Sequence, residues 1–367
     1  MSESIAFAQR LKLGLAGIFW FLLILFGFLG FMVIWPWPKW IVGAILAAAF
    51  LIAIPLFYLN RALSAPDSRA PAAWSYGKTA AGLALALLAI IGFPIYYAAF
   101  LVGDRPNLLP QVVLTNGTKS VVFQGMVHVG SEPFYKSIVY DLEKALADGY
   151  TLYYEGVQPS PGEGDKWFSE TLAGGGDLSA NYKKLGEVCG LKFQLDYFNL
   201  LSADAKVHPE RHITADVNAL QMKNEFDRLM AADPAFASAI AADKASKTPQ
   251  SNGSDTLTAG LAYVASGTED QKKLGAVLCR GFFAWSLKQQ GNKGVMDPVI
   301  LDFRNRELAK RIQQDPPAKI YLTYGAAHLP GLFKELQALD PAWKVVSHKW
   351  IRGIAAPEEF TATLPLN

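Results

Sequence analysis

Three uninterrupted apolar runs near the start of the chain constrain its fold most strongly. They cover residues 13–34, 41–59 and 80–102 and contain no Asp, Glu, Lys or Arg. A helix needs about 20 apolar residues to cross the hydrocarbon core of a bilayer. The sequence therefore predicts three transmembrane helices, which form a membrane anchor over residues 1–103.

A cleaved signal peptide is the alternative for the first run. Its apolar stretch is longer than the usual core of roughly 7–15 residues, and no cleavage pattern of small residues follows it. We therefore favour a retained anchor.

Basic residues predict the orientation of this anchor. Arg10 and Lys12 precede the first run, and three further basic residues lie in the connection between the second and third runs. The opposite side receives only Lys39 and Arg105. Lys and Arg concentrate on the cytoplasmic side, so we expect a cytoplasmic N-terminus and an extracytoplasmic domain over residues 104–367. In a bacterium this would be the inner membrane and the periplasm.

Composition narrows the function only by exclusion. The formal net charge of +2 over 367 residues gives no reason to expect nucleic acid as a partner. The chain contains no HExxH, GxSxG, P-loop or paired CxxC motif. Outside the cytoplasm, Cys189 and Cys279 can form one disulfide or remain as two buried thiols, and the sequence leaves both open.

The exported part carries the same strand–helix–strand pattern twice, which predicts an α/β domain with a central sheet. In the first copy, strands at 120–124 and 151–155 flank a helix that Ser131 caps and Pro133 begins. In the second copy, strands at 320–324 and 344–348 flank another amphipathic helix. Such units are most simply parallel and right-handed.

A large helical insertion, about residues 165–315, separates the two copies. Apolar periodicity predicts helices at 178–188, 215–230, 271–289 and 298–313, with Asp297 and Pro298 as the cap and first residue of the last one. Residues 247–258, rich in Ser, Asn and Gly, predict a loop.

Three side chains that suit chemistry fall at the carboxyl ends of predicted strands: His128, Glu155 and His328. Ligands gather at this edge of α/β sheets. Each histidine lies three residues after a glycine, Gly125 or Gly325, which allows a tight turn or close approach of a ligand. A single histidine is more often a hydrogen-bonded structural residue, but two in the same context favour a shared site.

Two imidazoles and a carboxylate are a common ligand set for a divalent metal ion. We therefore expect His128, His328 and Glu155 to hold such an ion, with Glu155 either as third ligand or as general base for a metal-bound water.

These segments resemble the paired GxxH motifs and strand-end glutamate of the TraB/GumN/Tiki superfamily. The helix at 303–309, with Arg304, is similar to that family's Arg-containing helix, and the acidic residue Asp216 matches a further position. The resemblance covers residues 121–346. It implies a fold related to erythromycin esterase and ChaN-like proteins and, from the Tiki members, a membrane-tethered protease that depends on a metal of the Mn, Co or Zn class.

On this reading Arg304 binds a carboxylate or stabilises negative charge on a carbonyl oxygen. Alternatively, Arg304 has no functional role and lies on a solvated face of the helix, because Arg306, Lys310 and Arg311 lie nearby. Alternatively, Asp216 has only a local role: it lies in the first turn of a helix capped by Thr214, where its negative charge interacts favourably with the helix dipole.

The sequence thus predicts a membrane-anchored hydrolase that acts on peptides or small esters outside the cytoplasm. The alternative is a non-catalytic protein that binds a peptide or haem in the same cleft. The lipid bilayer is the one partner predicted with either function, and the sequence leaves the oligomeric state open.

Overall fold

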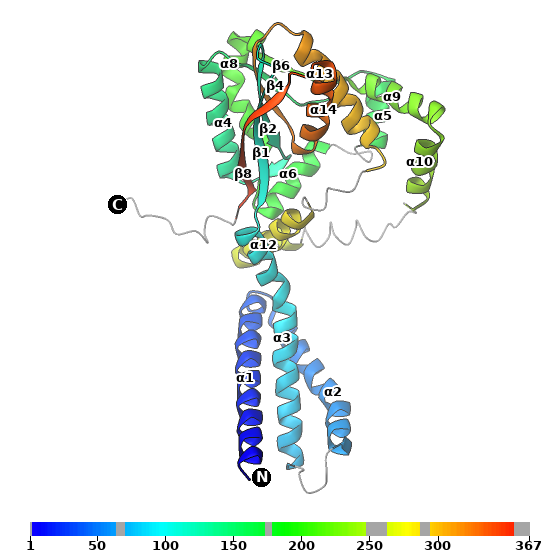
Figure 1. Ribbon diagram of the computed structural model, residues 1–367. Coiled ribbons are helices and arrows are strands. Elements are labelled where there is room, and N and C mark those ends of the chain that lie inside the picture. The colour runs from blue at the N-terminus through cyan, green and yellow to red at the C-terminus, as the bar shows by residue number, and fades with distance from the viewer. Residues whose placement is uncertain (1, 64–69, 173–177, 247–262, 287–293, 356–367) are drawn as a thin grey trace. The chain divides into compact units, whose positions relative to one another are not determined.

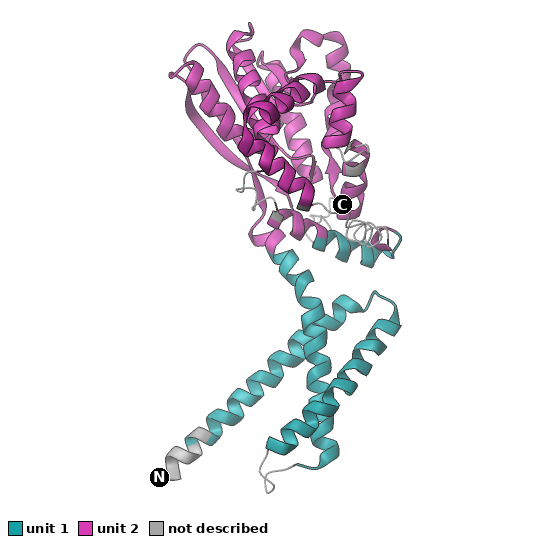
Figure 2. Ribbon diagram, turned by 90° about the vertical axis from the view of Figure 1, so that its right-hand side faces the viewer, with its two compact units in different colours: residues 1–100, 266–278 teal, residues 101–265, 279–367 magenta. Residues whose placement is uncertain are grey.

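The computed structural model describes residues 2–63, 70–172, 178–246, 263–286 and 294–355. The chain divides into two compact units, which Figure 2 colours separately. The first contains residues 1–100 and 266–278, and the second contains residues 101–265 and 279–367. The predicted loop at 247–258 lies outside the described residues.

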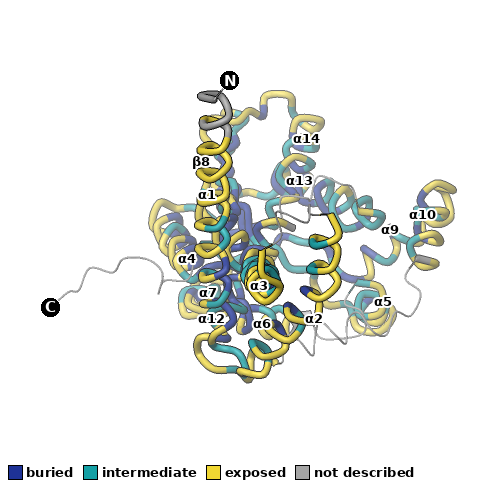
Figure 3. Tube along the Cα trace, turned by 90° about the horizontal axis from the view of Figure 1, so that it is seen from below, coloured by how far each residue is buried: buried dark blue, intermediate teal, exposed yellow. Residues whose placement is uncertain are grey.

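Three long helices make up most of the first unit: α1 (Ser2–Ile34), α2 (Lys39–Leu63) and α3 (Ala72–Asp104). Each is long and apolar enough to cross a membrane, as predicted. Most of their apolar side chains are exposed, and the tube of α1 in Figure 3 is mainly yellow. Such a surface needs lipid rather than water around it, which indicates a membrane protein.

Small residues let α1 and α3 approach closely. A Cβ atom added to Gly92 would lie only 2.6 Å from the Cα of Gly30. The Tyr96 hydroxyl donates a hydrogen bond of 3.0 Å to the carbonyl of Leu29 on the neighbouring helix. Glycine at a helix crossing is typical of membrane helices, whose association depends on close packing.

A six-stranded mixed sheet forms the centre of the second unit (Figure 1). Its order is β6-β4-β7-β2-β1-β8, and only β1 runs against the others. The strands are β1 (Asn107–Thr115), β2 (Ser120–Met126), β4 (Thr151–Tyr154), β6 (His212–Thr214), β7 (Lys319–Gly325) and β8 (Lys344–Ile354).

Both predicted strand–helix–strand units are parallel, but neither joins adjacent strands. Helix α4 (Glu132–Ala147) connects β2 to β4, with β7 lying between them. Helix α14 (Leu329–Leu339) connects β7 to β8, which lies beyond β2 and β1. The two units therefore interlock, and this places β7 between the two strands of the first unit. As a result, the exits of β2, β7 and β4 are neighbours.

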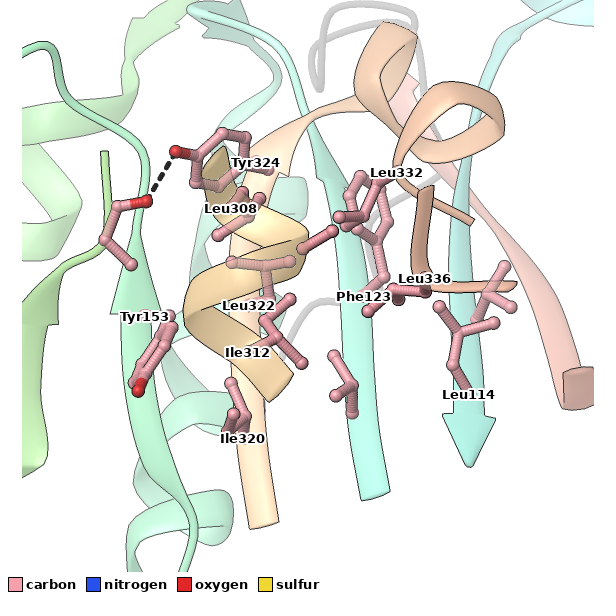
Figure 4. Close-up of a cluster of buried hydrophobic side chains, with 14 of the residues drawn as sticks. Leu114, Phe123, Tyr153, Leu308, Ile312, Ile320, Leu322, Tyr324, Leu332 and Leu336 are labelled. Atoms are coloured by element: carbon pink, nitrogen blue, oxygen red, sulfur yellow. Dashed lines mark hydrogen bonds between the residues drawn. The ribbon is translucent and has the colours of Figure 1, made fainter. Parts of the chain in front are cut away.

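Apolar side chains alternate along the central strands and build a core on each face of the sheet. On one face Phe123, Leu322 and Tyr324 pack against α13 (Arg304–Gln314) and α14, as Figure 4 shows. On the other face α4 packs through Ile138 and Leu142. Burial of each such side chain contributes about 1.5–3 kcal/mol, so the two helix layers fix the sheet that carries the strand exits.

The insertion is helical, as predicted, and its last helical segment begins at Pro298, as predicted, but the start of one other helix and the capping role of Asp297 were predicted wrongly. The predicted helix at 215–230 begins only at Ala219, because Asn218 and Gln221 form a capping box; Thr214 belongs to β6. The predicted helix at 298–313 is a π-helical turn (Pro298–Phe303) followed by α13. Asp297 does not cap it, since its carboxylate accepts a hydrogen bond from the amide of Gly294.

Seven further α-helices lie within the described residues. They are α5 (Glu163–Thr171), α6 (Leu178–Cys189), α7 (Gln194–Phe198), α8 (Ser202–Val207), α9 (Ala219–Ala232), α10 (Pro234–Ser246) and α12 (Glu269–Ser286). Ser131 precedes α4 as predicted, but its hydroxyl accepts from the amide of Ala355 instead of capping the helix.

Cys189 and Cys279 form a disulfide between the last residue of α6 and helix α12. The Cys189 side chain is fully buried in an apolar cluster with Val129, Leu191 and Ile354. Arg280, next to Cys279, donates from Nε to the carbonyl of Cys189 at 2.9 Å. The crosslink therefore holds the end of α6 in place.

Candidate functional site

Four of the predicted site residues meet at the carboxyl edge of the sheet. Glu155 directly follows β4, Asp216 follows β6, and His328 ends a short 3-10 turn (Ala326–His328) after β7. Arg304 is the first residue of α13 and points at all three. The register pairs Tyr154 with Thr323 across β4 and β7, which puts Glu155 beside the exit of β7.

Glu155 is held by two hydrogen bonds, one on each carboxylate oxygen. Oε1 accepts from Nη2 of Arg304 at 2.7 Å, and Oε2 accepts from the backbone amide of Gly325 at 2.6 Å. A Cβ on residue 325 would lie only 3.3 Å from Oε2, so glycine gives the carboxylate room to reach this amide. Burial would raise the pKa of Glu155, but His328 and Arg304 outweigh it and hold the pKa well below its usual value.

Arg304 is buried and directs five N–H bonds at protein acceptors. Its Nε and Nη2 grip both oxygens of Asp216, at 3.0 and 2.5 Å, while Nη2 also reaches Glu155. Nη1 faces the carbonyl of Ile300 and the Nε2 atom of His328, each at 3.3 Å. Since a guanidinium has five N–H donors, none is left over for a ligand in this conformation. Burial opposes the charge, but the two carboxylates raise the pKa of Arg304 above its ordinary value.

The side chain of Asp216 is only 1% exposed. It accepts hydrogen bonds from two backbone amides in addition to those from Arg304. Its Oδ2 accepts from the amide of Gly156 at 3.0 Å, and its Oδ1 accepts from the amide of Val217 at 2.8 Å. Asp216 precedes α9 and lies outside its first turn. The purely local helix-dipole role is therefore wrong, and Asp216 belongs to the cluster at the strand exits.

His328 is buried against the same group. Its Nδ1 lies 2.8 Å from Oδ1 of Asn305, and its Nε2 lies 3.6 Å from Oε1 of Glu155. Nε2 also lies 3.3 Å from Nη1 of Arg304. The ring meets Tyr324 edge-on at 5.1 Å. We define Glu155, Asp216, Arg304, Asn305 and His328 as the buried cluster.

His128 differs from this cluster because its side chain is exposed. It follows β2, whose last residue, Met126, pairs with Gly325 of β7. Its ring stacks on Tyr182 of α6 at 4.5 Å, and its Nδ1 lies 3.0 Å from Nε2 of Gln194. One side of the ring is open to solvent, but protein atoms surround the rest of it. They exclude water from the ring, disfavour its charged form and so lower the pKa of His128. Glu155 raises that pKa and Arg304 lowers it, so His128 lies within electrostatic range of the cluster.

The predicted metal ion does not fit the donors as they are arranged. The Arg304 guanidinium lies 2.7 Å from Oε1 of Glu155 and 3.3 Å from Nε2 of His328, and its charge would repel a divalent ion bound to these two groups. Nδ1 of His128 already faces Gln194. Among the described residues, no group of three or more His, Cys, Asp or Glu side chains is placed to hold a metal.

The two glycines of the motifs have different roles. Gly325 gives Glu155 access to a backbone amide, as above. A Cβ on Gly125 would lie 2.9 Å from Cδ and from the carbonyl oxygen of Pro110 and 3.1 Å from Cβ of Ala326. Glycine at 125 therefore allows β1 and the second turn to pack tightly, and this is a structural rather than a ligand-binding requirement.

Sequence reasoning missed Tyr182, Gln194 and Asn305. Tyr182 lies between the rings of His128 and Phe193, with Phe193 at 6.2 Å. Burial and the charge of Glu155 raise its pKa. Asn305 follows Arg304 directly, and that adjacency was the one available signal. Tyr182 and Gln194 belong to segments far from the motifs, and nothing in their local sequence marks them.

A groove of about 760 Å³ opens beside the second GxxH turn. Ala326, Ala327 and Pro330 form one wall, and segments of the insertion form the other. Its rim carries three carboxylates, of Asp233, Asp297 and Asp302. The groove is large enough for several residues of a peptide or for a small ester.

Comparison of the chain with models of known protein families, with curated proteins and with solved structures gives no significant match.

Proposed function

We propose that this chain is a membrane-anchored hydrolase of the TraB/GumN/Tiki kind, with an erythromycin esterase/ChaN-like fold, acting on peptide or ester bonds. One observation carries the proposal: residues between 128 and 328 in the sequence gather at the exits of neighbouring strands, where the side chain of His128 is exposed to solvent and that of Glu155 is partly exposed. The interlocked crossovers that produce this gathering support the fold assignment.

In this proposal His128 is the general base. Its lowered pKa keeps the imidazole neutral near pH 7, so the ring can take a proton from a water molecule that attacks the substrate carbonyl. The charge of Glu155 then stabilises the imidazolium. Tyr182 stacks on the ring, and the side-chain amide of Gln194 lies 3.0 Å from Nδ1. For His128 to act as a base, Gln194 turns its Oε1 atom to accept from Nδ1–H, which leaves the lone pair of Nε2 for the proton.

The buried cluster supports this reaction without touching the substrate. Arg304 keeps Glu155 ionised and holds both Glu155 and Asp216 in place through Nε and Nη2. Of the two predicted roles of Arg304, the binding of protein carboxylates agrees with this geometry. We derive no step through a metal ion.

The test is turnover by the full chain in detergent micelles. A panel of fluorogenic peptides and nitrophenyl esters should include at least one substrate whose hydrolysis the protein accelerates. We expect the rate to survive EDTA, because the cluster has no vacant donor set. Loss with EDTA and recovery with Mn²⁺, Co²⁺ or Zn²⁺ would instead show that Arg304 yields its place to a metal. No turnover of any substrate would contradict the hydrolase proposal.

The closed hydrogen bonding of the cluster favours a second candidate, a non-catalytic protein that binds a peptide or haem at the same strand exits, beside Glu155. Such a protein would bind members of the panel without cleaving them. Glu155→Gln would then change the affinity, measured by fluorescence anisotropy of labelled peptides or by haem absorbance, and no product would form.

The pH dependence of turnover gives an independent check on the general base. A base works only when unprotonated, and the pKa of His128 is lowered from its ordinary value of 6.5. We therefore expect kcat/KM to rise with pH and to level off, with the midpoint below 6.5. A midpoint clearly above 6.5 would exclude His128 as the group that limits the rate.

We further propose that the domain after α3 lies outside the cytoplasm. The basic residues before α1 and between α2 and α3 support this orientation, and so does the disulfide, which forms in oxidising compartments. An alkaline phosphatase fused after Asn367 should be active in a bacterial host, while a fusion in the connection after Leu63 should be inactive. The reverse result would place the domain in the cytoplasm.

A further inference from the structure

Helix α12 carries an exposed apolar stripe. Leu278, Phe282 and Trp285 are 40%, 60% and 48% exposed, respectively. Spacings of four and three residues put them on one side of the helix. Phe282 and Trp285 contact each other, with ring centroids 6.0 Å apart. Large apolar side chains in such a row are rare on a surface that meets only water.

The other side of α12 is already packed. Arg280 and Ala284 are buried, and Arg280 donates from Nη1 to the carbonyl of Ala355 at 2.8 Å. Cys279 is fixed by its disulfide to Cys189. The helix therefore cannot rotate to bury the stripe without breaking these bonds.

A residue on the same side of α12 as the stripe contacts the chain just after a predicted membrane span. Gln271 lies two helical turns before Leu278 on that same side. It is buried, and its Nε2 donates to the carbonyl of Pro36 at 2.9 Å. Pro36 follows the last residue of α1 and neighbours Trp35, which is 53% exposed. Tryptophan next to the end of a span is typical of the membrane–water interface.

We propose that α12 is an interfacial helix, with Leu278, Phe282 and Trp285 inserted among the lipids at the surface of the bilayer that α1–α3 cross. This inference does not depend on the hydrolase proposal. A second copy of the chain is the competing occupant of the stripe.

Spin labels on the full chain can test this, because its two native cysteines are paired and only an introduced cysteine reacts. Phe282→Cys and Leu278→Cys lie in the stripe, and Lys272→Cys is an exposed control on the flank of the same helix. In vesicles of phosphatidylethanolamine and phosphatidylglycerol, the two stripe labels should collide more with oxygen than with nickel-EDDA. The Lys272 label should show the reverse.

Two results would overturn the proposal. One is equal nickel-EDDA access at all three positions, which would put the stripe in water. The other is dipolar broadening between labels at position 282 that disappears on dilution with unlabelled protein, which would show a second copy on the stripe. Persistence of the native disulfide on non-reducing gels verifies that each labelled variant keeps the crosslink of α12 to α6.

Discussion

Replacement of His128 by glutamine should lower kcat/KM by about 10²–10⁴-fold, the usual contribution of a positioned general base. Glutamine is polar and of similar length but cannot take a proton. His128 is exposed and outside the hydrogen bonding of the buried cluster, so the variant should fold normally. Steady-state hydrolysis of the best substrate of the panel, with circular dichroism to check folding, measures the effect.

His208→Gln is the matched control. His208 is also exposed, and it lies 3.6 Å from the carboxylate of Glu210 in a surface ion pair. Its replacement should leave kcat/KM unchanged. Equal activity of the His128 and His208 variants would remove His128 from the reaction, and the hydrolase proposal would then lose the general base that it assigns.

The strands that carry the site could be predicted because their sequences fit a buried strand better than a helix or a loop. β2 and β7 are short apolar runs bounded by polar residues and followed by a glycine and a helix pattern. β1 was not predicted, since Pro110 within it reads against a strand. The structure places β1 as the antiparallel neighbour of β2 and β8, where long-range pairing outweighs the local signal.

Which residues lie at the site was easier to predict than which hydrogen bonds they form with one another. Strand ends identified His128, Glu155 and His328, because carboxyl ends of parallel strands share an edge. The sequence contains no information on which donor reaches which acceptor, and so it suggested a metal where the structure places the Arg304 guanidinium. Helix α9 is capped by Asn218 and not, as predicted, by Thr214. Asp216 therefore precedes the helix, and its side chain can face Arg304.

The disulfide gives the open side of the site a physical connection to α12. Helix α6 begins at Leu178, carries Tyr182 against His128, and ends at Cys189 in the crosslink. A covalent bond at one end of a short helix limits movement at its other end. The position of the His128 ring is thus fixed from two directions, by Gln194 beside it and by a tyrosine on a tethered helix.

Asp216→Ala should destabilise the domain that follows α3 by about 3–5 kcal/mol, because it removes the main partner of a buried guanidinium. Arg304 would keep only Glu155 as a counter-ion, and the amides of Gly156 and Val217 would lose their acceptor. For a domain of this size the loss corresponds to a fall in Tm of roughly 10 °C. Thermal unfolding of the full chain in micelles, followed by tyrosine and tryptophan near-UV circular dichroism, measures it.

Asp148→Ala is the control for this prediction, since it also removes one carboxylate from an ion pair. Asp148 pairs with Lys144 at 2.6 Å, but both side chains are at least half exposed and solvent screens the interaction. Its loss should leave the Tm nearly unchanged. If both variants shift Tm equally, Arg304 is solvated in solution and the buried cluster is open. A large shift for Asp216 alone means that the guanidinium is locked between carboxylates, as the absence of a metal step requires.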